Sequence, residues 1–221
     1  MDKIRAIITG VTGMVGEGVL HECLQHPEVE KVLVINRKPC GITHPKLTEI
    51  IHADFFDLSP VREAFRGYNA CFFCLGVSSV GMKEDKYRRL TYDLTVNFAK
   101  TLALPDNELT FCYVSGMGTD STAQGKIMWA RVKGQTENDL KKLPFKGAYM
   151  FRPGYIQPTK GLNHTHGILI PISWLYPLWR SLFPRHVCTL KELGLAMINV
   201  ARMGYRMPVL ESKDIVTAAG S

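Results

Sequence analysis

The sequence predicts an α/β fold, a doubly wound parallel sheet covered by helices, with a small C-terminal extension. A run of β-branched and apolar residues over 4–9 ends in glycines at positions 10, 13 and 16, and an amphipathic segment follows. This order is typical of the strand, glycine turn and helix of a Rossmann dinucleotide site. Further along, short apolar runs alternate with helical segments, as in parallel sheets with right-handed crossovers.

The glycine loop predicts a site for the phosphates of a dinucleotide. In such loops the first glycine allows a tight turn, the second lets a pyrophosphate approach the backbone, and the third lets the helix pack closely on the strand. The helix N-terminus adds free N–H groups and a partial positive charge. The spacing GxxGxxG is one residue longer in its first interval than GxGxxG, so a plain structural turn is the alternative. The loop residues expected to contact the cofactor are Gly10, Thr12, Gly13, Met14, Val15 and Gly16.

Composition and charge indicate an ordinary globular protein. The 221 residues are 46% hydrophobic and 21% charged, and we expect one nucleotide-binding domain over 1–221, of which 155–221 forms a lid-like part beside the substrate. The chain enters a strand with no apolar stretch of signal-peptide length, so a cytoplasmic location is expected. The net charge of +7 is spread along the chain without a nucleic-acid-binding motif, which excludes nucleic acid as the expected partner.

The cysteines and histidines predict no metal site. Cys71 and Cys74 form the only close pair of cysteines, and residues three apart on a strand point to opposite faces of the sheet. Reduced core thiols are therefore expected. His164 and His166 have no third ligand in sight, so they are expected to be loop residues.

The second expected strand, 31–36, ends just before Arg37 and Lys38. At this place, about 20 residues after the glycine loop, an acidic residue would bind the ribose 2′-hydroxyl of NAD, whereas an arginine accommodates the 2′-phosphate of NADP. Two bases and no acid stand here. We therefore expect NADP, with NAD as the alternative cofactor; solvated loop charges are the alternative role of the two cations.

A third strand is expected over 47–52 and a helix over about 59–66, with Ser59 as its N-cap. Asp54 and Phe55 lie just beyond the strand end, where open α/β sheets place ligand contacts. Asp54 either accepts a hydrogen bond from the adenine amino group or caps its own loop.

The remaining strands of the sheet are expected over 70–75, 109–115 and 148–151, separated by helices over 83–104 and 123–142. The strand ends supply further expected cofactor contacts, because ligands bind at the carboxyl ends of parallel strands. These contacts are Leu75, Gly76, Pro153 and Gly154.

The last third of the chain changes character. Residues 161–183 are rich in aromatic residues and prolines, and the apolar part, 168–183, is too short and too broken by Pro171, Pro177 and Arg180 to span a bilayer. No stable membrane insertion is expected; a substrate lid, a subunit contact and an interfacial membrane element remain open. The interfacial face would consist of Trp174, Leu178, Trp179 and Phe183. A last helix over 190–202 and a short strand over 208–210 are expected.

Four motifs together resemble the short-chain dehydrogenase/reductase superfamily. They are TGVTGMVG at 9–16, Ser115 after the fifth strand, VKG at 132–134 and FRPG at 151–154. Within the superfamily the chain resembles the atypical, NAD-dependent epimerase/dehydratase-like group and is similar to the Tat-interacting tumour-suppressor-like proteins. Dimerisation through the helices at 83–104 and 123–142 would follow the habit of the family.

The resemblance implies a catalytic Ser, Tyr and Lys. Ser115 matches the Ser, Lys133 matches the Lys, which would also hold the nicotinamide ribose, and Trp129 stands at the Tyr position. An indole N–H donates a hydrogen bond but cannot act as a general acid or base. Tyr155 is therefore a candidate substitute, with a packed aromatic as the alternative. Lys133 either contacts the ribose or pairs with Glu137 on the helix surface.

Two functions remain open at this point. One is an NADP-dependent oxidoreductase or epimerase acting on a small carbonyl or hydroxyl substrate, with Ser115 polarising the substrate oxygen. The other is a non-catalytic NADP(H)-binding protein that senses redox state or binds a partner, as Trp129 suggests.

Overall fold

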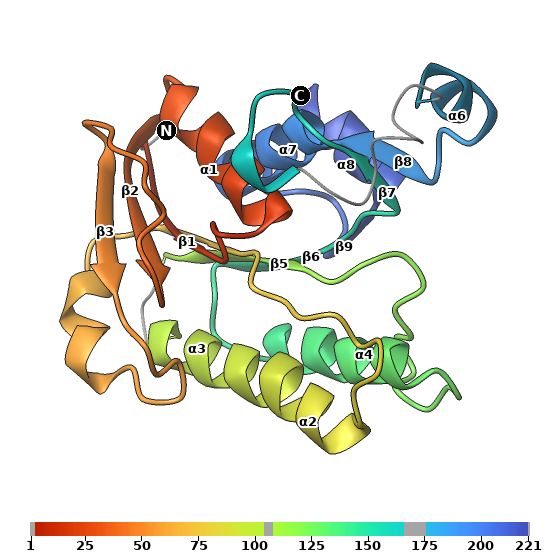
Figure 1. Ribbon diagram of the computed structural model, residues 1–221, viewed down its shortest axis with the longest axis horizontal. Helices are drawn as coiled ribbons and strands as arrows, with labels where there is room; N and C mark the ends of the chain where they lie inside the picture. The colour runs from red at the N-terminus through yellow and green to blue at the C-terminus, as the bar shows by residue number, and fades with distance from the viewer. Residues whose placement is uncertain (1–2, 104–107, 166–175, 221) are drawn as a thin grey trace.

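The computed structural model describes residues 3–103, 108–165 and 176–220, which build a parallel sheet between two layers of helices (Figure 1). The strand order β3-β2-β1-β4-β5-β6-β9 reverses between β1 and β4, and every neighbouring pair is parallel. This confirms the predicted doubly wound α/β fold. The strands are β1 (Ile4–Thr9), β2 (Val29–Asn36), β3 (Leu47–Ile51), β4 (Ala70–Phe73), β5 (Thr110–Val114), β6 (Gly147–Arg152) and β9 (Val209–Glu211).

Helices cover both faces of the sheet. On one face lie α1 (Met14–Gln25), α7 (Leu190–Met203) and α8 (Ser212–Ala219), and on the other lie α2 (Glu84–Arg88), α3 (Leu94–Leu102) and α4 (Met128–Leu140) (Figure 1). Successive residues of β1 enter the two cores in turn: Ile7 packs on the α3 side and Ile8 on the α1 side. Both faces of each central strand are therefore apolar, which explains the continuous apolar runs in the sequence.

Two helical segments differ from the expectation. The helix expected over 83–104 is α2 and α3, joined by a π-helical turn at Arg89–Asp93. The segment expected as a helix over 59–66 is a 3₁₀ helix, Ser59–Phe65.

The helix expected from residue 123 begins at Met128. The Asp120 carboxylate accepts hydrogen bonds from the backbone N–H groups of Thr122, Gln124 and Gly125. These bonds hold the chain in a loop, in which Ala123 has a φ of 56°. A short polar side chain that bonds nearby backbone groups competes in this way with helix formation.

The C-terminal third contains elements that the sequence pattern did not predict. The strands β7 (Tyr155–Gln157) and β8 (Val187–Thr189) form a separate parallel pair. The helix α6 (Tyr176–Leu182) contacts β8, and a short 3₁₀ turn at Asn163–Thr165 contacts α1. They lie on the side of the sheet that carries α7 and α8 (Figure 1). The expected last helix is α7, and α8 follows β9 without having been expected.

The structure also bears on the expectations about cysteines, metals and membranes. All six cysteines are free, and no group of three potential metal ligands lies together in the described ranges. None of the helices described here is long and apolar enough to cross a membrane. His166, Pro171 and Trp174 lie outside the described residues, as does part of the predicted interfacial face.

Candidate nucleotide site

The glycine loop packs so tightly that two of its glycines cannot carry a side chain. Gly10 has a φ of +74°, and a Cβ there would lie 2.7 Å from the backbone nitrogen of Leu75. A Cβ at Gly16 would lie 2.2 Å from the carbonyl oxygen of Gly10. The first glycine thus turns the chain against the end of β4, and the third brings α1 onto that turn, as a dinucleotide loop requires.

The N-terminus of α1 is left open toward this turn. Its N-cap residue, Gly13, has an extended backbone and makes no side-chain cap. Glu17, in the first turn, is buried and points elsewhere: its carboxylate accepts the backbone N–H groups of Asn163 and His164 at 2.7 and 2.8 Å. The first N–H groups of α1 and the positive end of its dipole are therefore suited to a phosphate.

A cavity of 550 Å³ lies beside the loop, at the carboxyl ends of β1, β2 and β4, where the strand order reverses. Eight of the residues expected to contact the cofactor line it, and they come from four separate segments of the chain. The lining consists of Gly10, Thr12, Gly13, Ile35, Asn36, Arg37, Lys38, Phe55, Cys74, Leu75 and Gly76. The size is within the range of ligand sites, and the tight glycine cradle fits a dinucleotide.

Arg37 and Lys38 are the charged residues of this lining. Both are exposed, and neither forms an ion pair with a described residue. The loop that carries them is held by Glu49 of β3, whose Oε1 accepts the side-chain amide of Asn36 at 2.8 Å and the backbone N–H of Cys40 at 2.9 Å. Glu49 was missed at the sequence level, because its pairing depends on the register between β2 and β3.

Other expected cofactor contacts do not line the cavity. Met14, Val15 and Gly16 form the first turn of α1. Asp54 caps its own loop, since its Oδ1 accepts the N–H of Phe56 at 2.8 Å, which is the alternative role considered for it. Asn36 and Cys74, in contrast, line the cavity without having been expected; their positions at strand ends were the available signal.

Pro153 and Gly154 follow β6 and connect it to neighbouring loops. The Pro153 carbonyl accepts the N–H of Met117 at 2.9 Å, and the Gly154 N–H donates to Ser212 Oγ at 2.9 Å. A Cβ at Gly154 would lie 2.1 Å from the carbonyl oxygen of His186. These residues thus join β6 to β8 and α8 outside the 550 Å³ cavity.

Ser115 and Lys133 lie together at the end of β5, but their polar groups are bonded within the protein. The Ser115 hydroxyl donates to Glu137 Oε1 at 2.6 Å, with the Phe151 carbonyl 3.2 Å away. Lys133 Nζ donates to the Ser115 carbonyl. Burial lowers the pKa of Lys133 to about 8, although the charge of Glu137 opposes this shift.

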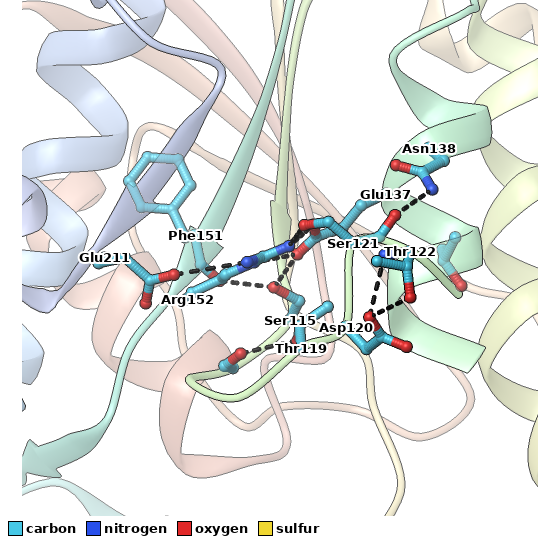
Figure 2. Close-up of polar contacts among 12 residues, drawn as sticks. Ser115, Thr119, Asp120, Ser121, Thr122, Glu137, Asn138, Phe151, Arg152 and Glu211 are labelled. Atoms are coloured by element: carbon cyan, nitrogen blue, oxygen red, sulfur yellow. Dashed lines mark hydrogen bonds and ion pairs between the residues drawn. The ribbon is translucent and has the colours of Figure 1, made fainter. Parts of the chain in front are cut away.

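A buried ion pair between Arg152 and Glu137 adjoins Ser115. Figure 2 shows the Arg152 side chain extended between Glu211 and Glu137, with Ser115 beside it. Arg152 donates to Glu137 through Nε at 2.9 Å and Nη2 at 2.5 Å, and to Ser121 Oγ at 2.7 Å. The more distant Glu211 oxygen lies 3.5 Å from Nη1.

Glu137 is fully buried, so the surface pair between Lys133 and Glu137 that was considered from the sequence is wrong. The i, i+4 spacing is present on α4, but the carboxylate points into the protein toward Arg152. Arg152 itself was not a candidate site residue. Nothing in the local pattern relates it to a residue 15 positions earlier.

Trp129 and Tyr155 occupy different surroundings. The indole of Trp129 packs on the loop after β5, with Cη2 3.4 Å from the place of a Cβ on Gly118. The Tyr155 hydroxyl donates to Gln157 Oε1 at 3.0 Å, and burial raises the pKa of Tyr155. Tyr155 lines an apolar hollow of 370 Å³ with Met117, Trp179, Phe183, His186 and Val187.

Comparison with known proteins gives one family and several relatives. Residues 6–106 match the NAD dependent epimerase/dehydratase family. The chain is 27% identical over 172 residues to the mitochondrial protein FMP52-1 of Scheffersomyces stipitis, covering 74% of this chain and 75% of the relative. It is also 27% identical over 183 residues to the protein HTATIP2 of Rattus norvegicus, covering 79% and 74%.

Solved structures share the fold at low sequence identity. The UDP-N-acetylglucosamine 4-epimerase of Methanobrevibacter ruminantium superposes with a TM-score of 0.65 at 15% identity, covering 93% of this chain and 75% of that one. The Bordetella bronchiseptica enzyme WbmG, solved in complex with NAD, gives 0.65 at 13% identity, covering 100% and 79%. Both likenesses concern the fold alone.

These relatives also correct one expectation and confirm another. The expected cytoplasmic location is contradicted, because FMP52 proteins of several fungi are named as mitochondrial. The matched N-terminal segment contains the glycine loop, β2 and β4, which form the cavity. The chain is thus a relative of the NAD-dependent epimerase/dehydratase proteins, and its resemblance to the atypical group of short-chain dehydrogenase/reductases is confirmed.

Proposed function

We propose that the chain binds NADP(H) in the 550 Å³ cavity and acts as an oxidoreductase or epimerase on a small carbonyl or hydroxyl compound. The observation that carries the choice of NADP is the pair Arg37 and Lys38, two exposed cations on a lining that contains no carboxylate. The 2′-phosphate that distinguishes NADP from NAD is an anion, and arginine suits it through paired N–H donors.

Each part of the lining has a role in this proposal. The glycine turn and the open end of α1 take the pyrophosphate. Phe55, whose side chain is buried at the cavity wall, offers an apolar surface for the adenine. Glu49 orients the loop of Arg37 and Lys38 through its bonds to Asn36 and Cys40.

When bound, NADPH would supply a hydride for a carbonyl carbon, and the carbonyl oxygen would then need a proton. With Trp129 at the Tyr position, that proton comes from another group. All three candidates donate to protein acceptors, Tyr155 to Gln157 Oε1 at 3.0 Å, but of the three only Tyr155 lines a hollow large enough for a small ligand. Tyr155 is therefore the proton donor in this proposal, and Lys133 is assigned to the nicotinamide ribose.

A second candidate function is a non-catalytic NADP(H)-binding protein. Two observations favour it: the Ser115 hydroxyl proton is directed to Glu137 instead of an open cavity, and an indole replaces the phenol of the family. Measuring NADPH oxidation distinguishes the two functions. An enzyme oxidises NADPH with some member of a carbonyl panel and loses about 10²–10⁴-fold in rate on Tyr155→Phe, whereas the binding protein shows no turnover with any of them.

Cofactor preference is tested by titrating the full chain with NADPH and NADH. Wild-type protein is expected to bind NADPH more tightly. The double variant Arg37→Ser, Lys38→Ser is expected to bind NADPH about 10- to 100-fold more weakly, because the loss of one charge-assisted hydrogen bond to the 2′-phosphate costs about 1.5–3 kcal/mol. NADH affinity should stay unchanged. Arg66→Ser, which removes a cation from an exposed pair with Glu63, is the matched control. Equal affinity of the wild type for both cofactors would refute the NADP assignment.

A further inference from the structure

We infer that the 370 Å³ hollow beside Tyr155 is a binding site for an uncharged ketone or aldehyde with an aryl or alkyl body. Its described lining consists of Met117, Tyr155, Trp179, Phe183, His186 and Val187. That the ligand carries a carbonyl group rests on the proposed function. That the rest of the ligand is apolar rests on the lining of the hollow itself.

The hollow adjoins the end of the sheet that carries the candidate catalytic residues. Met117 comes two residues after Ser115, and its N–H donates to the Pro153 carbonyl at 2.9 Å. Tyr155 begins β7 directly after Pro153 and Gly154, and its N–H donates to the His186 carbonyl at 2.9 Å. One wall therefore continues the loop after β5, and another continues the loop after β6. Both loops follow carboxyl ends of parallel strands, where α/β folds bind their ligands.

Aromatic side chains dominate the walls. The rings of Trp179 and Phe183 lie 5.7 Å apart, and those of Phe183 and His186 lie 6.4 Å apart. Trp179 is 41% exposed, Phe183 47% and Met117 44%. Together they form a concave apolar surface in contact with water, and covering it with an apolar ligand body is favourable.

Charge argues against a nucleotide sugar in this hollow. None of the described lining residues is a lysine or an arginine. Arg180, on the same helix as Trp179, is held by Glu192 at 2.7 and 3.0 Å, and Arg185 does not line the hollow. A diphosphate placed here would lose its hydration without gaining a cation, which is costly.

Neighbouring residues on α6 and its end provide a matched test. Phe183 lines the hollow, whereas Leu182, which is 61% exposed, does not. We expect acetophenone and 2-nonanone to bind the full chain saturably in calorimetry without any cofactor, and UDP-glucose not to bind. Phe183→Ser should weaken ketone binding about tenfold, the effect of losing part of an apolar pocket, while Leu182→Ser leaves it unchanged and NADPH affinity is the same in both variants.

The inference would be overturned by the absence of ketone binding, by UDP-glucose binding that Phe183→Ser abolishes, or by an equal loss of ketone binding in both variants. Binding to vesicles of phosphatidylcholine and phosphatidylglycerol tests the remaining alternative, a membrane-binding face. Vesicle binding weakened equally by Phe183→Ser and Leu182→Ser would make this face a membrane surface and exclude the ligand site. Because the ketone measurement uses no nicotinamide, ketone binding without NADPH binding would refute the proposed function and leave the apolar site standing.

Discussion

Replacing Glu137 with glutamine tests the buried ion pair that joins β6 to α4. The Glu137 carboxylate is fully buried and accepts hydrogen bonds from Ser115 at 2.6 Å and from Arg152 at 2.9 and 2.5 Å. In Glu137→Gln the amide oxygen can still accept one guanidinium hydrogen bond and Ser121 remains a partner, but the carboxylate left to Arg152 is the more distant Glu211, at 3.5 Å. The variant therefore leaves a buried positive charge largely without compensation.

Removing one partner of a buried ion pair costs about 3–5 kcal/mol. Because Glu211 still offsets part of the charge, we expect a loss near the lower end, about 3 kcal/mol in the free energy of unfolding. For a chain of this size that loss corresponds to a decrease in Tm of about 6–12 °C. Urea unfolding followed by circular dichroism measures the free energy, and a thermal scan measures Tm.

Two comparisons make the result specific. Glu63→Gln removes an acid from a pair with Arg66 in which both side chains are 75% exposed, and we expect a loss below about 1 kcal/mol there. The double variant Glu137→Leu, Arg152→Met removes both charges and should recover much of the stability lost in Glu137→Gln. A loss in Glu137→Gln no larger than in Glu63→Gln would refute the reasoning.

Two further predictions concern the glycine loop and the partly buried Lys133. Gly16→Ala places a methyl group 2.2 Å from the Gly10 carbonyl oxygen; it should lower the free energy of unfolding by about 1–3 kcal/mol and weaken NADPH binding. Gly76→Ala, whose methyl meets no described atom within 4 Å, is the control and should leave Tm nearly unchanged. Equal Tm losses in the two variants would contradict the tight turn. For Lys133, burial lowers the pKa from 10.5 to about 8. Between these pH values the unfolded chain binds the extra proton, so the free energy of unfolding rises with pH, and Lys133→Met should remove a rise of about 1–3 kcal/mol between pH 7 and 10.5. Unfolding curves of wild type and variant across this range measure the difference, and parallel pH dependence would show that the Lys133 ammonium is not desolvated in the folded protein.

Much of the fold could be predicted from local patterns. Mostly apolar runs identified the buried strands β1, β2, β4 and β5, because a strand covered on both faces needs apolar residues, whereas the edge strand β3 is only partly buried and includes Thr48 and Glu49. The glycines at 10, 13 and 16 located the turn, because a Cβ at two of them meets backbone atoms. Eight residues predicted from these strand ends and this loop meet in one cavity.

The pattern failed where a distant or competing contact decides the local structure. The helix expected from residue 123 begins at Met128 because the Asp120 carboxylate bonds three backbone N–H groups of the loop. The pair β7 and β8 joins segments about 30 residues apart by three residue pairs, too few for a recognisable alternation in either strand.

The sequence by itself determined the strand, turn and helix periodicity and the place of the nucleotide loop, because these depend on the sterics and burial of residues close together in the chain. Only the tertiary structure decided the polar pairings. Glu137 meets Arg152 instead of Lys133, Ser115 donates to Glu137, and Glu49 holds the loop of Arg37. A charged side chain in the interior pairs with whichever partner the packing of helix on sheet brings within about 3 Å, and that partner is set by register and not by sequence spacing.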